Sequence, residues 1–94
     1  MTSIRWTRAA AGDLEHIALY LQEHRPALAQ PTTIRLYQAA ASLADFPNRG
    51  RVGRLAGTRE LTAPPLPFVI VYTVAAGVVS IARVLHGAQS WPPQ

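Results

Sequence analysis

The chain has 94 residues, of which 49% are hydrophobic and 15% are charged, a composition that indicates a folded protein and excludes a disordered one. It contains no cysteine, which excludes disulfides and thiolate metal sites, and no apolar run approaches the ~18 residues that span a bilayer. All nine basic residues are arginines, and the net charge of +4 suits a polyanion or an acidic protein as partner. We expect one domain over residues 1–94, located in the cytoplasm and without membrane contact.

The first 24 residues predict a short strand followed by an amphipathic helix. Residues 2–6 alternate polar and apolar side chains, as in a half-buried strand. Thr7 is a suitable N-cap for the helix, which we expect to end near His24. Four apolar residues recur at the spacing of one helical stripe: Leu14, Ile17, Ala18 and Leu21.

A second helix follows, and its start depends on two prolines. Pro26 suits the first turn of a helix, where a backbone N–H has no partner inside the helix. Pro31 would remove a donor from a helix that already ran from Pro26, so the helix either begins near Pro31 or is kinked there. Residues 46–50 (Phe-Pro-Asn-Arg-Gly) end it. The short link between the two helices predicts an antiparallel hairpin.

The remainder of the chain predicts a sheet. Gly57 separates two short strands, residues 63–67 form a stiff connection with three prolines, and residues 75–77 form a turn. The expected strands are residues 51–55, 58–62, 68–74 and 78–85. This order predicts an α+β fold, in which an N-terminal strand and an antiparallel helical hairpin pack on a small, mainly antiparallel sheet.

Four of the nine arginines fall within eleven residues that contain no acid. These residues are Arg49, Arg51, Arg54 and Arg59. Such a concentration of positive charge favours an anionic binding partner. A solvated surface patch without a binding role is the alternative.

Several motifs occur in an order that is similar to one toxin superfamily. Residues 57–61 are Gly-Thr-Arg-Glu-Leu, residues 67–72 are Pro-Phe-Val-Ile-Val-Tyr, and residues 83–87 are Arg-Val-Leu-His-Gly. Together with Trp6 and the 46–51 exit from the second helix, they resemble the RelE/ParE superfamily of bacterial type II toxin–antitoxin toxins. The resemblance covers roughly residues 4–92.

The resemblance implies a growth-inhibiting toxin that forms a hetero-oligomer with its cognate antitoxin. The antitoxin is expected to be a small protein whose acidic segment folds on binding. RelE-like members cleave mRNA in the ribosomal A site, whereas ParE-like members inhibit DNA gyrase, so the target is either gyrase or the ribosome with its mRNA. No metal or organic cofactor is indicated.

If the chain is a ribonuclease, three residues are candidates for catalysis. Attack by a 2′-hydroxyl on the adjacent phosphate needs a base, an acid and fixed positive charge. Arg59 and Arg83 can supply the charge, because guanidinium groups bind phosphate oxygens in a bidentate manner. His86 can act as the acid or base, because imidazole exchanges protons near neutral pH.

Structural alternatives exist for two of these residues. Arg83 lies within an apolar strand and could pair with Glu60, the only nearby carboxylate of the motifs. His86 could be a hydrogen-bonded strand terminus. Alternation also gives Arg83 and His86 opposite parity, so their side chains converge only if the strand bends or ends before His86.

One departure from the resemblance favours the gyrase branch. RNA-cleaving relatives carry a phosphate-binding arginine after the aromatic residue of the penultimate strand, but here Val69 follows Phe68. We therefore expect ParE-like inhibition of gyrase, which is not an enzymatic activity. The alternatives are a RelE-like, ribosome-dependent mRNA endoribonuclease and an inert binding module on the same scaffold.

The target-binding residues are expected on the sheet face and in the basic segment, which comprises residues 49–59. They are Arg49, Arg51, Arg54, Gln89 and Trp91. For Trp91, packing of the C-terminal segment on the core is the alternative.

Overall fold

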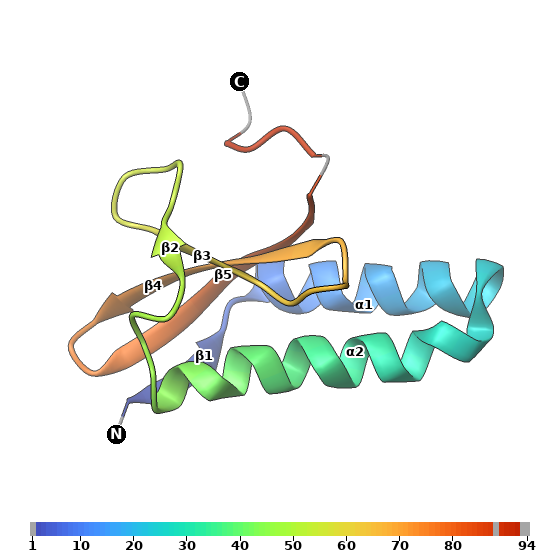
Figure 1. Ribbon diagram of the computed structural model, residues 1–94, viewed down its shortest axis with the longest axis horizontal. Coiled ribbons are helices and arrows are strands. Elements are labelled where there is room, and N and C mark those ends of the chain that lie inside the picture. Colours follow the sequence, from blue (N-terminus) through green and yellow to red (C-terminus); the bar gives the residue numbers. More distant parts are fainter. Residues whose placement is uncertain (1, 88, 93–94) are drawn as a thin grey trace.

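The computed structural model describes residues 2–87 and 89–92, and it places two helices on one face of a five-stranded sheet (Figure 1). The elements are β1 (Ser3–Trp6), α1 (Arg8–His24), α2 (Pro26–Ala41), the 3-10 turn η1 (Ser42–Ala44), β2 (Arg51–Val52), β3 (Arg59–Thr62), β4 (Phe68–Ala75) and β5 (Val78–His86). The strand order is β1-β5-β4-β3-β2, with β1 parallel to β5 and the other pairs antiparallel. The predicted α+β class is confirmed, as is the helical hairpin on a mainly antiparallel sheet.

The start of α1 is joined directly to β5 by Thr7. Its hydroxyl oxygen accepts the Ala10 N–H at 3.1 Å, which is the predicted N-cap. The same hydroxyl donates to the carbonyl of Ile81 at 2.8 Å, and the Thr7 N–H donates to that carbonyl at 3.1 Å. Because β1 ends at Trp6, Thr7 continues the contact with β5 and sets where α1 begins beside the sheet.

The second helix begins at Pro26 and continues through Pro31 to Ala41 without interruption. Of the two alternatives, the start near Pro31 is therefore wrong. Pro31 is exposed, and so is Ala27, whose carbonyl loses its helical partner and can bind water instead. Packing of the buried face, formed by Ala29, Thr32, Leu36 and Ala40, holds the helix across this position. Within the described residues, neither helix is long and apolar enough to cross a membrane.

The segment between β2 and β3 differs from the prediction. The expected strand 51–55 pairs only over Arg51–Val52, and residues 53–58 form a compact loop instead. Gly53 N–H donates to the Thr58 carbonyl at 2.8 Å, and the Thr58 hydroxyl donates to the Leu55 carbonyl at 2.6 Å. The loop bends because its hydrogen bonds are local and do not extend the ladder.

The main core lies between the helices and the sheet. It consists of Ala10, Leu36, Ala40, Leu43, Leu61, Ile70, Tyr72, Val79, Ile81 and Val84. Tyr72 is fully buried, and its hydroxyl donates to the Pro47 carbonyl at 2.7 Å and accepts the Gly50 N–H at 2.9 Å. Tyr72 therefore fixes the chain where it leaves α2. A side chain at position 50 would not fit, because an added Cβ would lie 2.8 Å from the tyrosine hydroxyl.

The opposite face of the sheet, called the open face below, carries a second and smaller apolar cluster. Val69, Val71 and Leu85 are buried there, with Trp91 and Ala82 packed against them. The pairing of β4 with β5 is irregular at Ala82: Tyr72 pairs with Ile81 and the adjacent Val71 pairs with Arg83, so Ala82 forms a β-bulge. Figure 1 shows the loop between β2 and β3 and the C-terminal segment rising on the side away from the helices. The open face is thus flanked by these two segments.

Candidate functional site

Glu60 of β3 organises the basic segment on the open face. Its side chain is fully buried, and one carboxylate oxygen accepts a hydrogen bond from Arg51 at 2.9 Å. The other oxygen accepts the Arg54 N–H at 2.9 Å and the Arg54 Nε–H at 3.1 Å. Arg51 lies directly opposite Glu60 in the ladder, whereas Arg54 reaches it from the loop. One carboxylate therefore fixes two arginines and the loop backbone.

The surroundings of Glu60 keep it ionised. Burial by itself would raise the pKa of Glu60, but the backbone hydrogen bond from Arg54 and the side-chain hydrogen bonds from Arg54 and Arg51 outweigh it. Together they lower the pKa of Glu60 from 4.5 to about 2. The carboxylate therefore remains charged throughout the physiological range.

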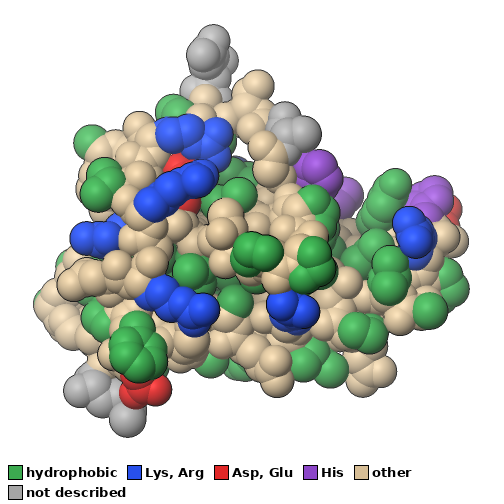
Figure 2. Space-filling model, viewed as in Figure 1, with side chains coloured by type: hydrophobic (Ala, Val, Ile, Leu, Met, Phe, Trp, Pro, Cys, Tyr) green, Lys and Arg blue, Asp and Glu red, His purple; other side chains and the backbone are tan. Residues whose placement is uncertain are grey.

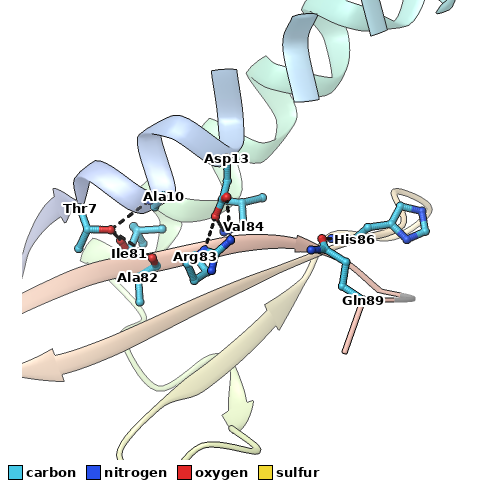
Figure 3. A network of polar contacts seen from close by, with 9 residues as sticks. All are labelled: Thr7, Ala10, Asp13, Ile81, Ala82, Arg83, Val84, His86 and Gln89. Carbon is cyan, nitrogen blue, oxygen red and sulfur yellow. Dashed lines mark hydrogen bonds and ion pairs between the residues drawn. The ribbon is translucent and has the colours of Figure 1, made fainter. Parts of the chain in front are cut away.

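Arg83 of β5 is bound to α1 by a bidentate ion pair (Figure 3). Its Nε–H and Nη2–H donate to the two oxygens of Asp13 at 2.7 and 3.0 Å, and Asp13 also accepts the Val84 N–H at 2.9 Å. The hydrogen bond to Asp13 raises the pKa of Arg83 above its ordinary value. Because β1 ends at Trp6, this part of β5 has a free edge, and Asp13 supplies the acceptor that a neighbouring strand would have provided.

The expected alternative that Arg83 pairs with Glu60 is wrong. Both side chains lie on the open face, but Val71 of β4 separates them, since Val71 pairs with Glu60 on one side and with Arg83 on the other. Each of the two charges instead meets a nearer partner: Asp13 for Arg83, and Arg51 of β2 with Arg54 of the loop for Glu60.

The three candidate catalytic residues lie apart. Arg59 faces away from Glu60 and donates to the Gly50 carbonyl at 2.7 Å, on the loop that follows α2. The ring of His86 meets Phe68 edge-on with 5.8 Å between ring centroids. β5 continues through His86, so the opposite parity of Arg83 and His86 is retained, and Figure 3 shows the His86 ring directed away from Arg83.

The expected target-binding residues also lie in three separate parts of the structure. Besides Arg51 and Arg54, only Trp91 lies on the open face, where the Arg83 guanidinium is 5.8 Å from its ring centroid. Arg49 donates to the Ser42 hydroxyl at 2.9 Å beside the end of α2. Gln89 Oε1 accepts the His86 N–H at 2.7 Å, which closes the turn after β5.

The net positive charge lies on the sheet and its connections. The helical segment 8–41 carries three arginines and three acids, whereas the rest carries six arginines against two acids and thus the whole charge of +4. In Figure 2, arginine side chains gather over the region of β2 and β3, with an acidic side chain between two of them. This distribution makes the sheet side the electrostatically attractive one for an anionic partner.

A groove that the sequence did not predict lies between the helical hairpin and the ends of β4 and β5. Its volume is about 540 Å³, its walls are mainly apolar, and Asp13, His86 and Gln89 are among its lining residues. The only sign of this groove in the sequence was the apolar stripe of α1, part of which lines the groove because the sheet does not cover it fully. Among the described residues, no group of three acids or histidines is placed to hold a metal ion.

Comparison with known proteins identifies the family. The model of the ParE toxin of the type II toxin–antitoxin system parDE matches residues 4–91. The chain belongs to the ParE toxin family. It is also similar to two curated toxins: RelE2 of Caulobacter vibrioides, with 44% identity over 95% of this chain and 99% of that protein, and the putative toxin Y4kP of Sinorhizobium fredii, with 37% identity over 95% and 92%.

A solved structure agrees with this assignment. A chain of the chromosomal ParDE system from P. aeruginosa superposes with a TM-score of 0.83 at 27% identity, covering 92% of this chain and 96% of that chain. The toxin thus has the fold of this family as well as its sequence. The RelE/ParE resemblance expected from the motifs is confirmed, and the protein is the toxin of a type II toxin–antitoxin system, with an antitoxin as its partner.

Proposed function

We propose that this toxin inhibits DNA gyrase and does not cleave RNA. The observation that carries the proposal is the separation of the three groups that RNA cleavage would require. Arg83 is held by Asp13, Arg59 is held by the carbonyl of Gly50, and His86 lies on the other face of β5 from Arg83. Acid–base catalysis on a phosphate needs these groups around one reacting atom.

The position of Val69 supports the same conclusion. In the RNA-cleaving branch, the resemblance predicts a phosphate-binding arginine at this place in the penultimate strand. Here Val69 is buried, and Trp91 packs against its cluster on the open face. This position therefore offers a phosphate no hydrogen-bond donor, and the aromatic ring beside it suits a protein partner better.

The proposal includes where the toxin acts and how it binds. Gyrase is a cytoplasmic enzyme, so the toxin acts in the cytoplasm. The open face and the basic segment 49–59 contact the target or the antitoxin, whose acidic segment matches the positive charge of this side. The antitoxin would inhibit by occupying the same side.

The test has two parts. When the toxin is induced in cells without its antitoxin, we expect growth arrest with an SOS response and intact mRNA. When the purified toxin is added to purified gyrase, we expect loss of supercoiling activity. The variant His86→Ala should retain the growth arrest, since gyrase inhibition does not use this imidazole. Early collapse of translation with codon-positioned mRNA cuts, abolished in His86→Ala, would establish the ribonuclease instead. Growth without arrest would establish the inert binding module.

A further inference from the structure

Glu60 is unusual among the acidic residues of the toxin. Among the described residues it is the one carboxylate whose side chain is fully buried, and it is paired with two partly exposed arginines, Arg51 and Arg54. A buried carboxylate costs free energy unless it is paired and hydrogen-bonded, and here three hydrogen bonds satisfy it. Such an arrangement fixes the positions of the two arginines more firmly than an exposed ion pair would.

The guanidinium groups of the pair retain donors that face solvent. The side chains of Arg51 and Arg54 are 63% and 45% exposed. Each guanidinium has five N–H donors, and among the described residues Glu60 is the only acceptor of their side-chain hydrogen bonds. Two planar groups held side by side with outward donors match the geometry of a carboxylate or a phosphate.

We propose that Glu60 is a positioning residue, which holds Arg51 and Arg54 as a pair of guanidinium groups that binds a carboxylate of a protein partner. The surroundings favour a protein over a nucleic acid. Val71 pairs with Glu60 in the sheet and belongs to the buried apolar cluster against which the partly exposed Trp91 packs. The arginine pair and an aromatic side chain therefore lie on the same face, and arginine and aromatic residues are enriched in protein interfaces.

A nucleic acid would require a different charge pattern. Affinity for a phosphate backbone comes from several cations that neutralise successive phosphates. On the open face, the arginines that border the apolar cluster already share carboxylates, namely Arg51 and Arg54 with Glu60 and Arg83 with Asp13. The proposal concerns the chemistry of this site and does not depend on whether the target is gyrase.

The variant Glu60→Gln separates positioning from simple attraction. It raises the net charge from +4 to +5, so charge alone predicts tighter binding of any anion. Positioning predicts weaker binding, because a neutral amide cannot hold both guanidinium groups. The probes are a fluorescein-labelled peptide rich in Glu and Leu and a labelled single-stranded RNA of equal charge, with fluorescence anisotropy as the readout. We expect Glu60→Gln to weaken peptide binding about tenfold; unchanged or tighter binding would overturn the proposal.

A pair of charge-matched variants provides the control and remains informative if Glu60→Gln does not fold. Arg51→Ala with Arg54→Ala and Arg8→Ala with Arg35→Ala each remove two arginines, so both carry a net charge of +2. Arg8 and Arg35 are exposed on α1 and α2, outside the basic segment 49–59, and Arg35 donates to the Pro64 carbonyl. We expect loss of peptide binding in the first variant and near-native binding in the second.

Three further outcomes decide the proposal. Equal losses in the two double variants would show that only net charge matters and would overturn it. Binding of the RNA that exceeds peptide binding and is lost only in the first variant would assign the site to nucleic acid instead. Arg51→Lys with Arg54→Lys keeps the charge but removes the planar forks, so it should bind the peptide several-fold more weakly. Native affinity in this variant would contradict a geometric role for the pair.

Discussion

Asp13 and Arg83, which are 70 residues apart in the sequence, form a bidentate ion pair that joins α1 to β5. The same carboxylate accepts the N–H of Val84, so three hydrogen bonds converge on one side chain. Val84 belongs to the main core and is almost fully buried. The pair therefore closes the free edge of β5 at the point where the parallel strand β1 has ended.

Removal of this carboxylate should destabilise the toxin. Asp13→Ala leaves the Val84 N–H without its acceptor and Arg83 without its partner, so we expect a loss of about 2 kcal/mol in the free energy of unfolding. Glu15→Ala, two residues away on an exposed part of the same helix, should change it by less than about 0.5 kcal/mol. Urea denaturation followed by circular dichroism measures both. Equal effects of the two variants would refute a special role for Asp13.

The Asp13 and Arg83 substitutions should also be coupled. If the two side chains act mainly on each other, Asp13→Ala with Arg83→Ala should destabilise less than the sum of the single variants, by about 1 kcal/mol.

The single variant Arg83→Ala should abolish toxicity and spare antitoxin binding, because it releases Trp91 on the open face while α1 keeps its packing. A double-mutant cycle, a growth assay and antitoxin pull-down test these statements. Additive single effects would contradict the coupling, and loss of the folded spectrum in Arg83→Ala would show a purely structural role.

Stability should depend on pH through Glu60. Its pKa is about 2 in the folded toxin, against an ordinary value of 4.5, so the unfolded chain takes up a proton first as the pH falls. The contribution of Glu60 is fully present above about pH 4.5 and is lost as the pH falls toward 2. It amounts to at most about 3 kcal/mol, and solvent screening at the partly exposed guanidinium groups reduces it.

The measurement is urea denaturation between about pH 6 and about pH 3. As the pH is lowered, the free energy of unfolding of the native toxin should decrease. The decrease should be less steep in Glu60→Gln, because the amide at position 60 has no proton to gain. Parallel curves for the two proteins would show that other carboxylates cause the acid sensitivity.

Tyr72 should be sensitive to loss of its hydroxyl alone. Tyr72→Phe retains the ring in the core but leaves the Gly50 N–H and the Pro47 carbonyl without their partner. We expect a destabilisation of roughly 1–3 kcal/mol, measured as a lower urea midpoint with unchanged slope. Tyr37→Phe, in which the exposed ring still stacks on Trp6, is the control and should be close to native. A native midpoint for Tyr72→Phe would mean that water replaces the hydroxyl.

Two glycines should respond in opposite directions to alanine. At Gly50 the new Cβ would lie 2.8 Å from the carbonyl oxygen of Glu60 and from the tyrosine hydroxyl, so Gly50→Ala should destabilise by about 1–3 kcal/mol. At Gly12, which is exposed in α1, an added Cβ would meet no atom within 4 Å apart from the neighbouring backbone of the helix, and Gly12→Ala should stabilise by roughly 0.5–1 kcal/mol. Thermal unfolding of both variants decides this. Destabilisation by Gly12→Ala would be inconsistent with an unconstrained helical position.

The helices and the central hairpin could be predicted because their signals are local. The Thr7 cap, the apolar stripe of α1 and the β-branched run of β4 each specify an element within a few residues. The start of α2 could not be predicted in the same way. Local rules allowed two starts around Pro31, and the choice depended on the packing of Leu36 and Ala40 against a sheet formed later in the chain.

The sequence by itself determined the family, the α+β class and the basic character of the sheet side, because motif order, periodicity and charge are properties of the chain. Only the tertiary structure decided which charges meet. Asp13 and Glu60 are both acids near an arginine in space, but the strand order places Val71 between Glu60 and Arg83, and the end of β1 brings α1 to the edge of β5. Ion pairs form over a few ångströms, so partners depend on strand register and on helix placement, which sequence separation does not reveal.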